Sequence, residues 1–204
     1  MATPPYALLL VDLGGVVVEF DTDRVVHHAA TVLGRSFDEV QRAVYRHDLL
    51  LPFELGQITP EDYYRGLKAQ IGLSWSYEQF VRAWNDIFHE QRDVTALVDA
   101  LRARHTVMAL TNTNALHLAY LKTTIPLLSQ VDGIVASCEV GLRKPDPAIY
   151  RLALERAGFP AQAAVYIDDR PEFVEAGRAV GLTAIRFTSS QQLASELRAL
   201  GLAV

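Results

Sequence analysis

The chain has 204 residues, of which 50% are hydrophobic and 9% aromatic, enough for one packed domain or one domain with a small insertion. A formal net charge of -5, with Lys and Arg scattered along the chain, argues against a nucleic-acid partner. The single cysteine, Cys138, excludes an intrachain disulfide and a cysteine-based zinc site. There is no basic leader and no apolar run near the ~20 residues of a membrane helix, so we expect a cytoplasmic protein without a membrane partner.

The first predicted element is a buried strand, "YALLLV" at residues 6–11, which ends at Asp12 and is followed by a pair of glycines. The segments from residue 21 to about residue 90 read as helices, with no convincing strand pattern among them. Capping patterns mark three of the helix starts, at Ser36, Thr59 and Ser76. Turns with Gly separate these helices, so this region is expected to be wholly helical.

From residue 93 onward the pattern alternates between helices and strands. Strands are predicted at residues 106–110, 133–137, 163–167 and 183–187, and helices at 93–105, 115–121, 146–158, 171–181 and 190–201. Alternation of this kind indicates an α/β fold with a doubly wound parallel sheet, and continuously apolar strands indicate burial on both faces. We therefore expect a core made of residues 1–17 and 92–204, with a helical insertion of residues 18–91 after the first strand.

Polar side chains follow four of the predicted strands, where ligands of open parallel sheets bind. Asp12 follows the first, Thr111 and Asn112 follow the second, a loop leading to Lys144 follows the third, and Asp168 and Asp169 follow the fourth. Alone, an aspartate there is as well explained as a turn residue or helix cap, and Thr111 as an N-cap. Two adjacent acids beside a buried strand also suit Mg²⁺, which prefers oxygen ligands.

Lys144 lies just before the helix that starts near Asp146 and Pro147. A cation is disfavoured near a helix N-terminus, whereas an anion is favoured there. The amine is therefore expected to point at a bound anion or at the carboxylates, and the alternative is a solvated surface lysine.

Together, "LLLVDLGGV", "MALTNTN", "VGLRKPDPAIY" and "VYIDDRPEFVEAG" resemble, in order, the four motifs of the haloacid dehalogenase-like (HAD) hydrolase superfamily. The separation of 99 positions from Asp12 to Thr111 leaves room for the helical cap such families insert there, and "FELGQIT" and "AWNDIF" resemble cap segments. The "DLGGV" form is most similar to the subgroup of small sugar-phosphate phosphatases and epoxide hydrolase N-terminal phosphatase domains. The resemblance implies a Rossmann-like core and a magnesium-dependent phosphatase acting on a small phosphorylated metabolite, with sugar phosphates among the candidates.

The resemblance also implies roles for individual residues. Asp12 would be the nucleophile that forms an aspartyl-phosphate, and Lys144 would neutralise charge on the substrate. Thr111, the backbone N–H of Asn112 and Lys144 would hold the phosphoryl group. The set expected to bind Mg²⁺ comprises Asp12, the backbone carbonyl of Gly14, Asp168 and Asp169.

One position departs from the pattern. Phosphatases of this superfamily usually carry a second Asp two residues after the nucleophile, which protonates the leaving alcohol, and here that position is Gly14. A cap residue could supply the proton instead, the candidates being His47, Asp48 and Glu54. Otherwise the enzyme is slow, acts on a leaving group that needs little protonation, or has lost phosphatase chemistry.

Two rival functions stay open on the sequence. A metal-free 2-haloacid dehalogenase would use Asp12 to displace halide, but it is expected to carry an aromatic residue at position 14 and needs no paired acids. A non-catalytic protein that binds a phosphorylated ligand on the same scaffold is favoured only by the missing acid. The oligomeric state is expected to be monomer or homodimer.

For several further residues of the predicted cap we prefer a structural or solvent-exposed role to a functional one. Arg42, Arg46 and His47 form either a patch facing a phosphosugar or, as we prefer, a solvated helix face. The aromatic residues Tyr63, Tyr64, Trp75 and Trp84 are expected in the cap core. His27, His28 and His117 lack partners at ligand spacing, so they are not assigned to a metal site.

Overall fold

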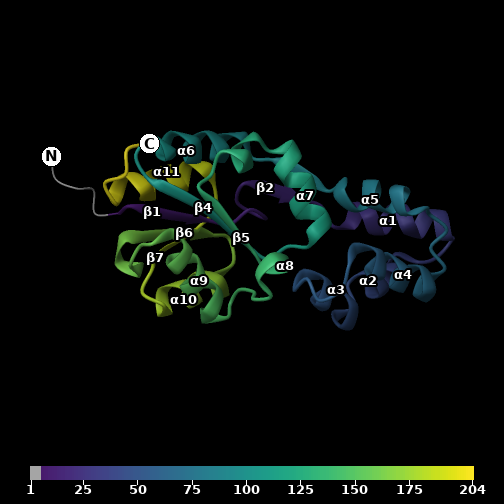
Figure 1. Cartoon of the computed structure of the whole chain (residues 1–204). Coiled ribbons are helices and arrows are strands. Elements are labelled where there is room, and N and C mark those ends of the chain that lie inside the picture. The colour runs from purple at the N-terminus through teal and green to yellow at the C-terminus, as the bar shows by residue number, and fades with distance from the viewer. Residues whose placement is uncertain (1–5) are drawn as a thin grey trace.

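A five-stranded parallel sheet forms the centre of the larger of two lobes (Figure 1). The structure is a computed structural model that describes residues 6–204, so the first five residues of the predicted segment 1–17 lie outside the described residues. The strand order is β5-β4-β1-β6-β7. The strands are β1 (Leu8–Val11), β4 (Thr106–Thr111), β5 (Gly133–Ala136), β6 (Ala164–Asp168) and β7 (Thr183–Arg186). The predicted parallel sheet is therefore confirmed.

Helices cover both faces of this sheet, because alternate strand residues point to opposite sides. Leu9 and Val11 face the helices α6 (Arg92–Arg102) and α11 (Ser190–Ala199), whereas Leu8 and Leu10 face α9 (Pro147–Ala157) and α10 (Pro171–Ala179). Each strand of the centre is buried on both sides, which explains its continuous apolar sequence. The doubly wound arrangement is confirmed.

Four further elements complete this lobe within the described residues. They are α7 (Ala115–Thr124), α8 (Ser137–Val140), and the 3₁₀ turns η1 (Pro126–Ser129) and η2 (Ala161–Ala163). The strand predicted at 133–137 stops at Ala136, because Ser137 already begins α8. The Ser137 hydroxyl accepts a hydrogen bond from the Thr113 backbone N–H at 2.9 Å, and this bond connects the segments that follow β4 and β5.

The second lobe consists of helices with a separate hydrophobic core (Figure 1). The helices are α1 (Asp23–Leu33), α2 (Phe37–Val44), α3 (His47–Glu54), α4 (Pro60–Ile71) and α5 (Tyr77–Asn85). The predicted starts at Ser36, Thr59 and Ser76 are all N-caps whose hydroxyl accepts from the third residue of the helix. Tyr63 and Phe80 lie at the centre of this lobe, both almost fully buried.

A two-stranded antiparallel sheet joins the lobes, and here the sequence prediction was wrong. β2 (Val18–Phe20) pairs with β3 (Phe88–Glu90). β3 lies in residues 21–90, where no strand was expected, and β2 lies in the insertion of residues 18–91, which was expected to be helical. Three residues are too few to display a period of two, and the partner lies about 70 residues away, so no local pattern reveals the strand. The chain thus leaves and re-enters the α/β lobe through adjacent strands.

Within residues 6–204, none of the helices combines the length and apolar character needed to cross a membrane.

Candidate active site

Three carboxylates meet where β1 and β6 end. Val11 pairs with Ile167 in the sheet, so Asp12, the next residue along, lies beside Asp168, the last residue of β6. One oxygen from each of Asp12, Asp168 and Asp169 can be chosen so that all three lie within 4.8 Å of one another. Asp12 and Asp168 are buried and Asp169 is half-buried. The structure thus brings together the acids expected from the two strand ends.

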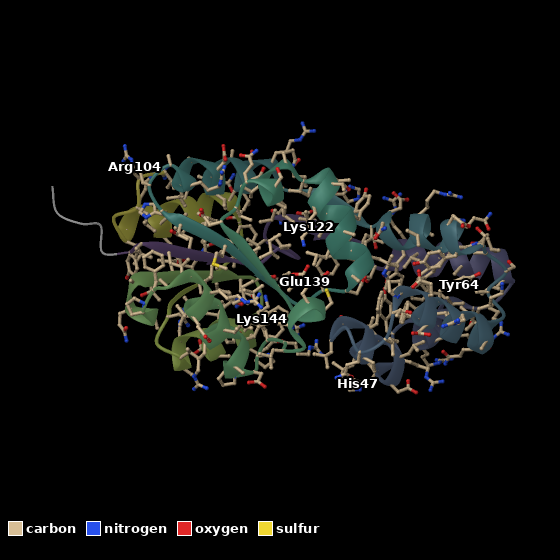
Figure 2. The ribbon with its side chains drawn as sticks, in the orientation of Figure 1. His47, Tyr64, Arg104, Lys122, Glu139 and Lys144 are labelled. Carbon is tan, nitrogen blue, oxygen red and sulfur yellow. The ribbon has the colours of Figure 1, made fainter. Side chains whose placement is uncertain are left out.

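Lys144 lies inside this cluster, and Figure 2 shows it in the interior of the α/β lobe. Its Nζ is 2.9 Å from Asp12 Oδ2 and 2.6 Å from Asp168 Oδ2, and it also donates to the carbonyl of Leu110 at 3.1 Å. The ammonium group therefore donates two hydrogen bonds, to Asp168 and Leu110, and forms an ion pair with Asp12. The prediction that the amine points at the carboxylates is confirmed, and the surface-lysine alternative is wrong.

Asn112 fixes the loop that carries Lys144. Its side-chain amide donates to the Lys144 carbonyl at 2.9 Å, and its side-chain oxygen accepts from the Lys144 backbone N–H at 2.8 Å. The loop ends at Asp146, which caps α9 by accepting from the Ala148 amide at 2.8 Å. The Asn112 side chain is thus committed to positioning Lys144, which the sequence did not reveal.

Asp168 is held by groups besides Lys144. The Tyr166 hydroxyl donates to Asp168 Oδ2, and the Arg170 backbone N–H donates to Oδ1 at 2.9 Å. Tyr166 was missed from the sequence, although residues two apart on a strand share a face and "YID" therefore placed a hydroxyl beside the acid. Both Asp168 oxygens are occupied by protein donors.

Asp169 approaches the chain at Gly15, not at Gly14. A Cβ at Gly15 would lie 2.5 Å from the Asp169 carboxyl carbon, and the Gly15 φ of +78° is itself unfavourable for other residues. At Gly14 the neighbour is Phe20, whose Cε1 would lie 3.0 Å from an added Cβ. The ring therefore borders the space in which an acid at position 14 would begin.

The cluster is short of positive charge. Three carboxylates face one ammonium group, which leaves an excess of two negative charges at full ionisation. Burial raises the pKa of Asp12 to about 7, with a further contribution from the Asp168 carboxylate, against the opposing effect of Lys144. Burial and Asp168 also raise the pKa of Asp169. This set of oxygen donors and its charge fit a hard divalent cation such as Mg²⁺.

A cavity of about 160 Å³ lies beside the cluster, between the two lobes. Gly14, Thr111 and Asn112 line it from the α/β lobe, and Glu54 is the charged residue of its wall. Thr111 is the last residue of β4, and the helix after it is capped by Asn114. The position of the Gly14 carbonyl relative to a metal stays a prediction.

The three proton-donor candidates differ in their position relative to the cavity. Glu54 lines the cavity and its Oε2 lies 3.2 Å from Nη2 of Arg143. His47 and Asp48 are exposed, and Asp48 pairs with Arg46. Figure 2 shows His47 at the lower edge of the helical lobe, whereas Lys144 lies inside the other lobe.

The other residues considered in the helical lobe lie where a structural or solvent-exposed role would place them. Tyr63, Trp75 and Trp84 are buried in its core, and Tyr64 packs against it. Arg42, Arg46 and His47 are exposed and do not line the cavity, which fits a solvated helix face.

The histidines do not form a metal site with the acids. His117 bonds Asn114 and the Trp84 carbonyl, while His27 and His28 are exposed. The metal-compatible group found within residues 6–204 contains no histidine.

The fold and the site define a class of protein, a doubly wound parallel α/β scaffold that carries a carboxylate–lysine cluster at its strand ends and a separate helical lobe. The chain belongs to the haloacid dehalogenase-like hydrolase family, which matches residues 6–181.

Known relatives are similar over most of the chain. The sesquiterpene phosphatase astK of Aspergillus oryzae is 33% identical over 150 residues, covering 72% of this chain and 76% of that protein. The D-ribitol-5-phosphate phosphatase of Bacteroides thetaiotaomicron is 24% identical over 182 residues, covering 85% and 87%. A HAD family enzyme from the same bacterium, solved with magnesium and inorganic phosphate, superposes with a TM-score of 0.82 at 23% identity, covering 92% and 98% of the chains.

Proposed function

We propose that this protein is a magnesium-dependent phosphatase that hydrolyses a small phosphorylated metabolite through an aspartyl-phosphate on Asp12. The observation that carries the proposal is the buried cluster in which Lys144 bridges Asp12 and Asp168 while Asp169 lies within reach. The phosphatase names of two relatives, and the magnesium and phosphate in the structure of a third, support the same reaction.

In this mechanism Asp12 attacks phosphorus and forms the acyl phosphate, while the bond to the leaving alcohol breaks. A phosphate monoester is anionic, so an attacking carboxylate needs positive charge around it. Lys144 supplies one such charge, and its ion pair with Asp12 and its hydrogen bonds to Asp168 and Leu110 hold the ammonium group in place. Thr111 and the backbone N–H of Asn112 are proposed to bind phosphoryl oxygens.

Asp12, Asp169 and the Gly14 carbonyl would hold the metal, with Asp168 as a further ligand or a support for it. We favour Asp169 over Asp168 as the direct ligand, because both Asp168 oxygens already accept hydrogen bonds from the protein. When bound, Mg²⁺ supplies the positive charge that the cluster lacks and stabilises the charge on the phosphoryl group.

Glu54 is the residue we propose for the leaving-group proton. It lines the cavity shared with Gly14 and Thr111, and burial raises its pKa, although Arg143 acts in the opposite direction. Its carboxyl group would donate a proton to the departing alcohol oxygen. It would then accept one from the water that attacks the aspartyl-phosphate, which restores Asp12 and releases phosphate.

Residues 18–91 are proposed as the cap, closing on a core made of residues 1–17 and 92–204. The separate hydrophobic clusters of the two lobes support these boundaries. The cytoplasmic location and the monomeric or homodimeric state stay predictions.

Phosphate release from p-nitrophenyl phosphate and acetyl phosphate tests the proposal. We expect turnover with Mg²⁺, loss of turnover on adding a chelator, and loss in Asp12→Asn. Acid quenching during turnover should trap phosphate on the wild-type chain alone. The exposed Asp38→Asn serves as the matched control and should resemble wild type.

Three results would overturn the proposal. The first is equal release by Asp12→Asn and wild type. Halide release from a 2-haloacid in chelator would instead identify a dehalogenase. Stoichiometric binding of a phosphorylated ligand without turnover would identify a binding protein.

A further inference from the structure

The wall of the cavity is mostly hydrocarbon. The helical lobe and the connecting strands contribute to it, through Phe20, Val25, Leu50, Trp84, Ile87 and Phe88. The same cavity reaches Gly14, Thr111 and Asn112 beside the carboxylate cluster. A phosphoryl group held at Asp12 would therefore place its alcohol portion against this wall.

Most polar side chains in the wall are already committed to the protein. The Tyr45 hydroxyl donates to the Thr22 carbonyl at 3.1 Å. The Asn114 amide nitrogen lies 3.0 Å from His117 Nδ1, and the second ring nitrogen of His117 lies 3.0 Å from the Trp84 carbonyl. Polar groups that already hydrogen-bond within the protein cannot bind the hydroxyls of a sugar without losing these bonds.

The cavity lining has few charged side chains that could bind a second polar or charged group of a substrate. No lysine or arginine belongs to the cavity lining among residues 6–204, and Glu54 is paired with Arg143. A second phosphate would find no cation on this wall. A polyol would face hydrocarbon along most of its length, and most of its hydroxyls would be desolvated without partners.

Phe20 points to the same conclusion. Phe20 is 49% exposed, although it lies at the cavity and borders Gly14 beside the nucleophile. Within residues 6–204, Val32 is the other large apolar residue with similar exposure, at 47%, and it lies outside the cavity. An aromatic ring left open next to the reacting group is a surface that an apolar ligand would cover.

We propose that the substrate is the phosphate monoester of an apolar alcohol, alkyl or aryl, and not a phosphorylated sugar. This inference rests on the proposed phosphatase activity and names its substrate class. The cavity has about the volume that holds a benzene molecule, so an apolar group of about six carbon atoms would fill it.

A homologous series of n-alkyl monophosphates, from ethyl to octyl, tests the proposal with the full-length protein and Mg²⁺. Each methylene buried should raise kcat/KM about fourfold until the cavity is full, so hexyl phosphate should exceed ethyl phosphate about 10²-fold. Phenyl phosphate tests the aryl alternative. Hexyl phosphate should also exceed ribitol 5-phosphate and glucose 1-phosphate.

Acetyl phosphate is the reference substrate, because its small acyl group hardly enters the cavity. Phe20→Ser should lower kcat/KM for hexyl phosphate about tenfold more than for acetyl phosphate. Val32→Ser removes an equally exposed apolar side chain outside the cavity and should change neither value.

The outcomes separate this inference from the proposed function. A flat alkyl series, or faster turnover of the sugar phosphates, overturns the apolar substrate class while leaving the phosphatase proposal intact. Failure to hydrolyse any of these compounds, acetyl phosphate included, overturns both.

Discussion

The two lobes differ in chemistry where they meet at the cavity. The α/β lobe holds three carboxylates and one ammonium group beside the cavity, and hydrogen bonds to protein groups fix Lys144 and Asp168. The helical lobe and the connecting strands present mainly hydrocarbon, with Glu54 as the charged exception. We infer that the α/β lobe carries out the phosphoryl chemistry and that the helical lobe selects the alcohol portion of the substrate.

The lobes also differ in what holds their functional groups. Lys144 is fixed by two carboxylates and a carbonyl, so its geometry depends on a network within the α/β lobe. Glu54 has one ion-pair partner, Arg143, which lies across the lobe boundary. Variants in the α/β lobe should therefore damage folding and catalysis together, whereas variants facing the cavity from the helical lobe should act on the reaction alone.

The largest effect is expected from Lys144→Met, which leaves Asp12 and Asp168 buried without their cation. Breaking a buried ion pair in this way costs about 3–5 kcal/mol in the free energy of unfolding. Urea denaturation in chelator measures this loss, and phosphate release should disappear as well. A variant as stable as wild type would show that the network does not hold this lobe together.

Lys122→Met is the matched control for that measurement. Lys122 forms an ion pair with Glu139 at 3.0 Å, but both side chains are more than 40% exposed. Figure 2 shows this pair and Lys144 in the same view. Exposed pairs contribute no more than about 1 kcal/mol, so Lys122→Met should unfold nearly as wild type does.

Glu54→Gln should affect catalysis more than folding. Loss of a general acid lowers the rate by about 10²-fold or more when the leaving alcohol needs a proton. Steady-state turnover of an alkyl phosphate should show this drop, whereas acetyl phosphate should lose much less, because acetate leaves without protonation. Asp48→Asn removes an exposed acid from the same helix and should leave both rates unchanged. Equal losses for the two substrates would argue against Glu54 as the proton donor.

Gly15→Ala should weaken magnesium binding. The added methyl group would collide with the Asp169 carboxylate, and the positive φ adds about 1–2 kcal/mol of backbone strain. Gly34→Ala meets the same backbone penalty, because φ is +62° there, but nothing lies within 4 Å of the added group. Titration calorimetry with Mg²⁺ should therefore separate the two variants, although both lose stability. Unchanged affinity in Gly15→Ala would remove Asp169 from the proposed ligand set.

The sequence predicted the α/β lobe well because its signals are local. Each strand is a short apolar run, and Asp12 and Asp168 stand where such runs end. Parallel strands align their carboxyl ends, so residues far apart in the chain can be placed together without knowing the packing. The two hydrogen bonds from the Asn112 side chain to the Lys144 backbone could not be predicted, because they depend on the path of two loops.

The cavity could not be predicted in this way. Its wall collects Phe20, Leu50 and Trp84 from separate elements, and helical periodicity alone marks such residues as core. The choice of Glu54 over His47 depends on how α3 docks against the α/β lobe. Gly56, just after that helix, shows how close the docking is, since a Cβ there would lie 2.1 Å from the Cys138 carbonyl oxygen.

The smallest expected effect concerns His117, which connects the lobes through its hydrogen bond to the Trp84 carbonyl. Burial lowers the pKa of His117 to about 4, from an ordinary value of 6.5. The unfolded chain therefore binds a proton between pH 6.5 and 4 that the folded chain does not. His117 accordingly makes the free energy of unfolding fall as the pH drops through this range, by at most about 1.4 kcal/mol per pH unit, and contributes no slope above it.

His117→Gln should remove this contribution, because glutamine cannot take up the proton. Urea denaturation at several pH values between 7 and 4 should then show a shallower decline for the variant than for wild type, even if the variant is less stable at pH 7. His89→Gln, at an exposed position of β3, controls for loss of a histidine as such. If wild type and His117→Gln declined in parallel, the acid sensitivity would belong to the carboxylate cluster, and the contact between the lobes would not depend on a neutral histidine.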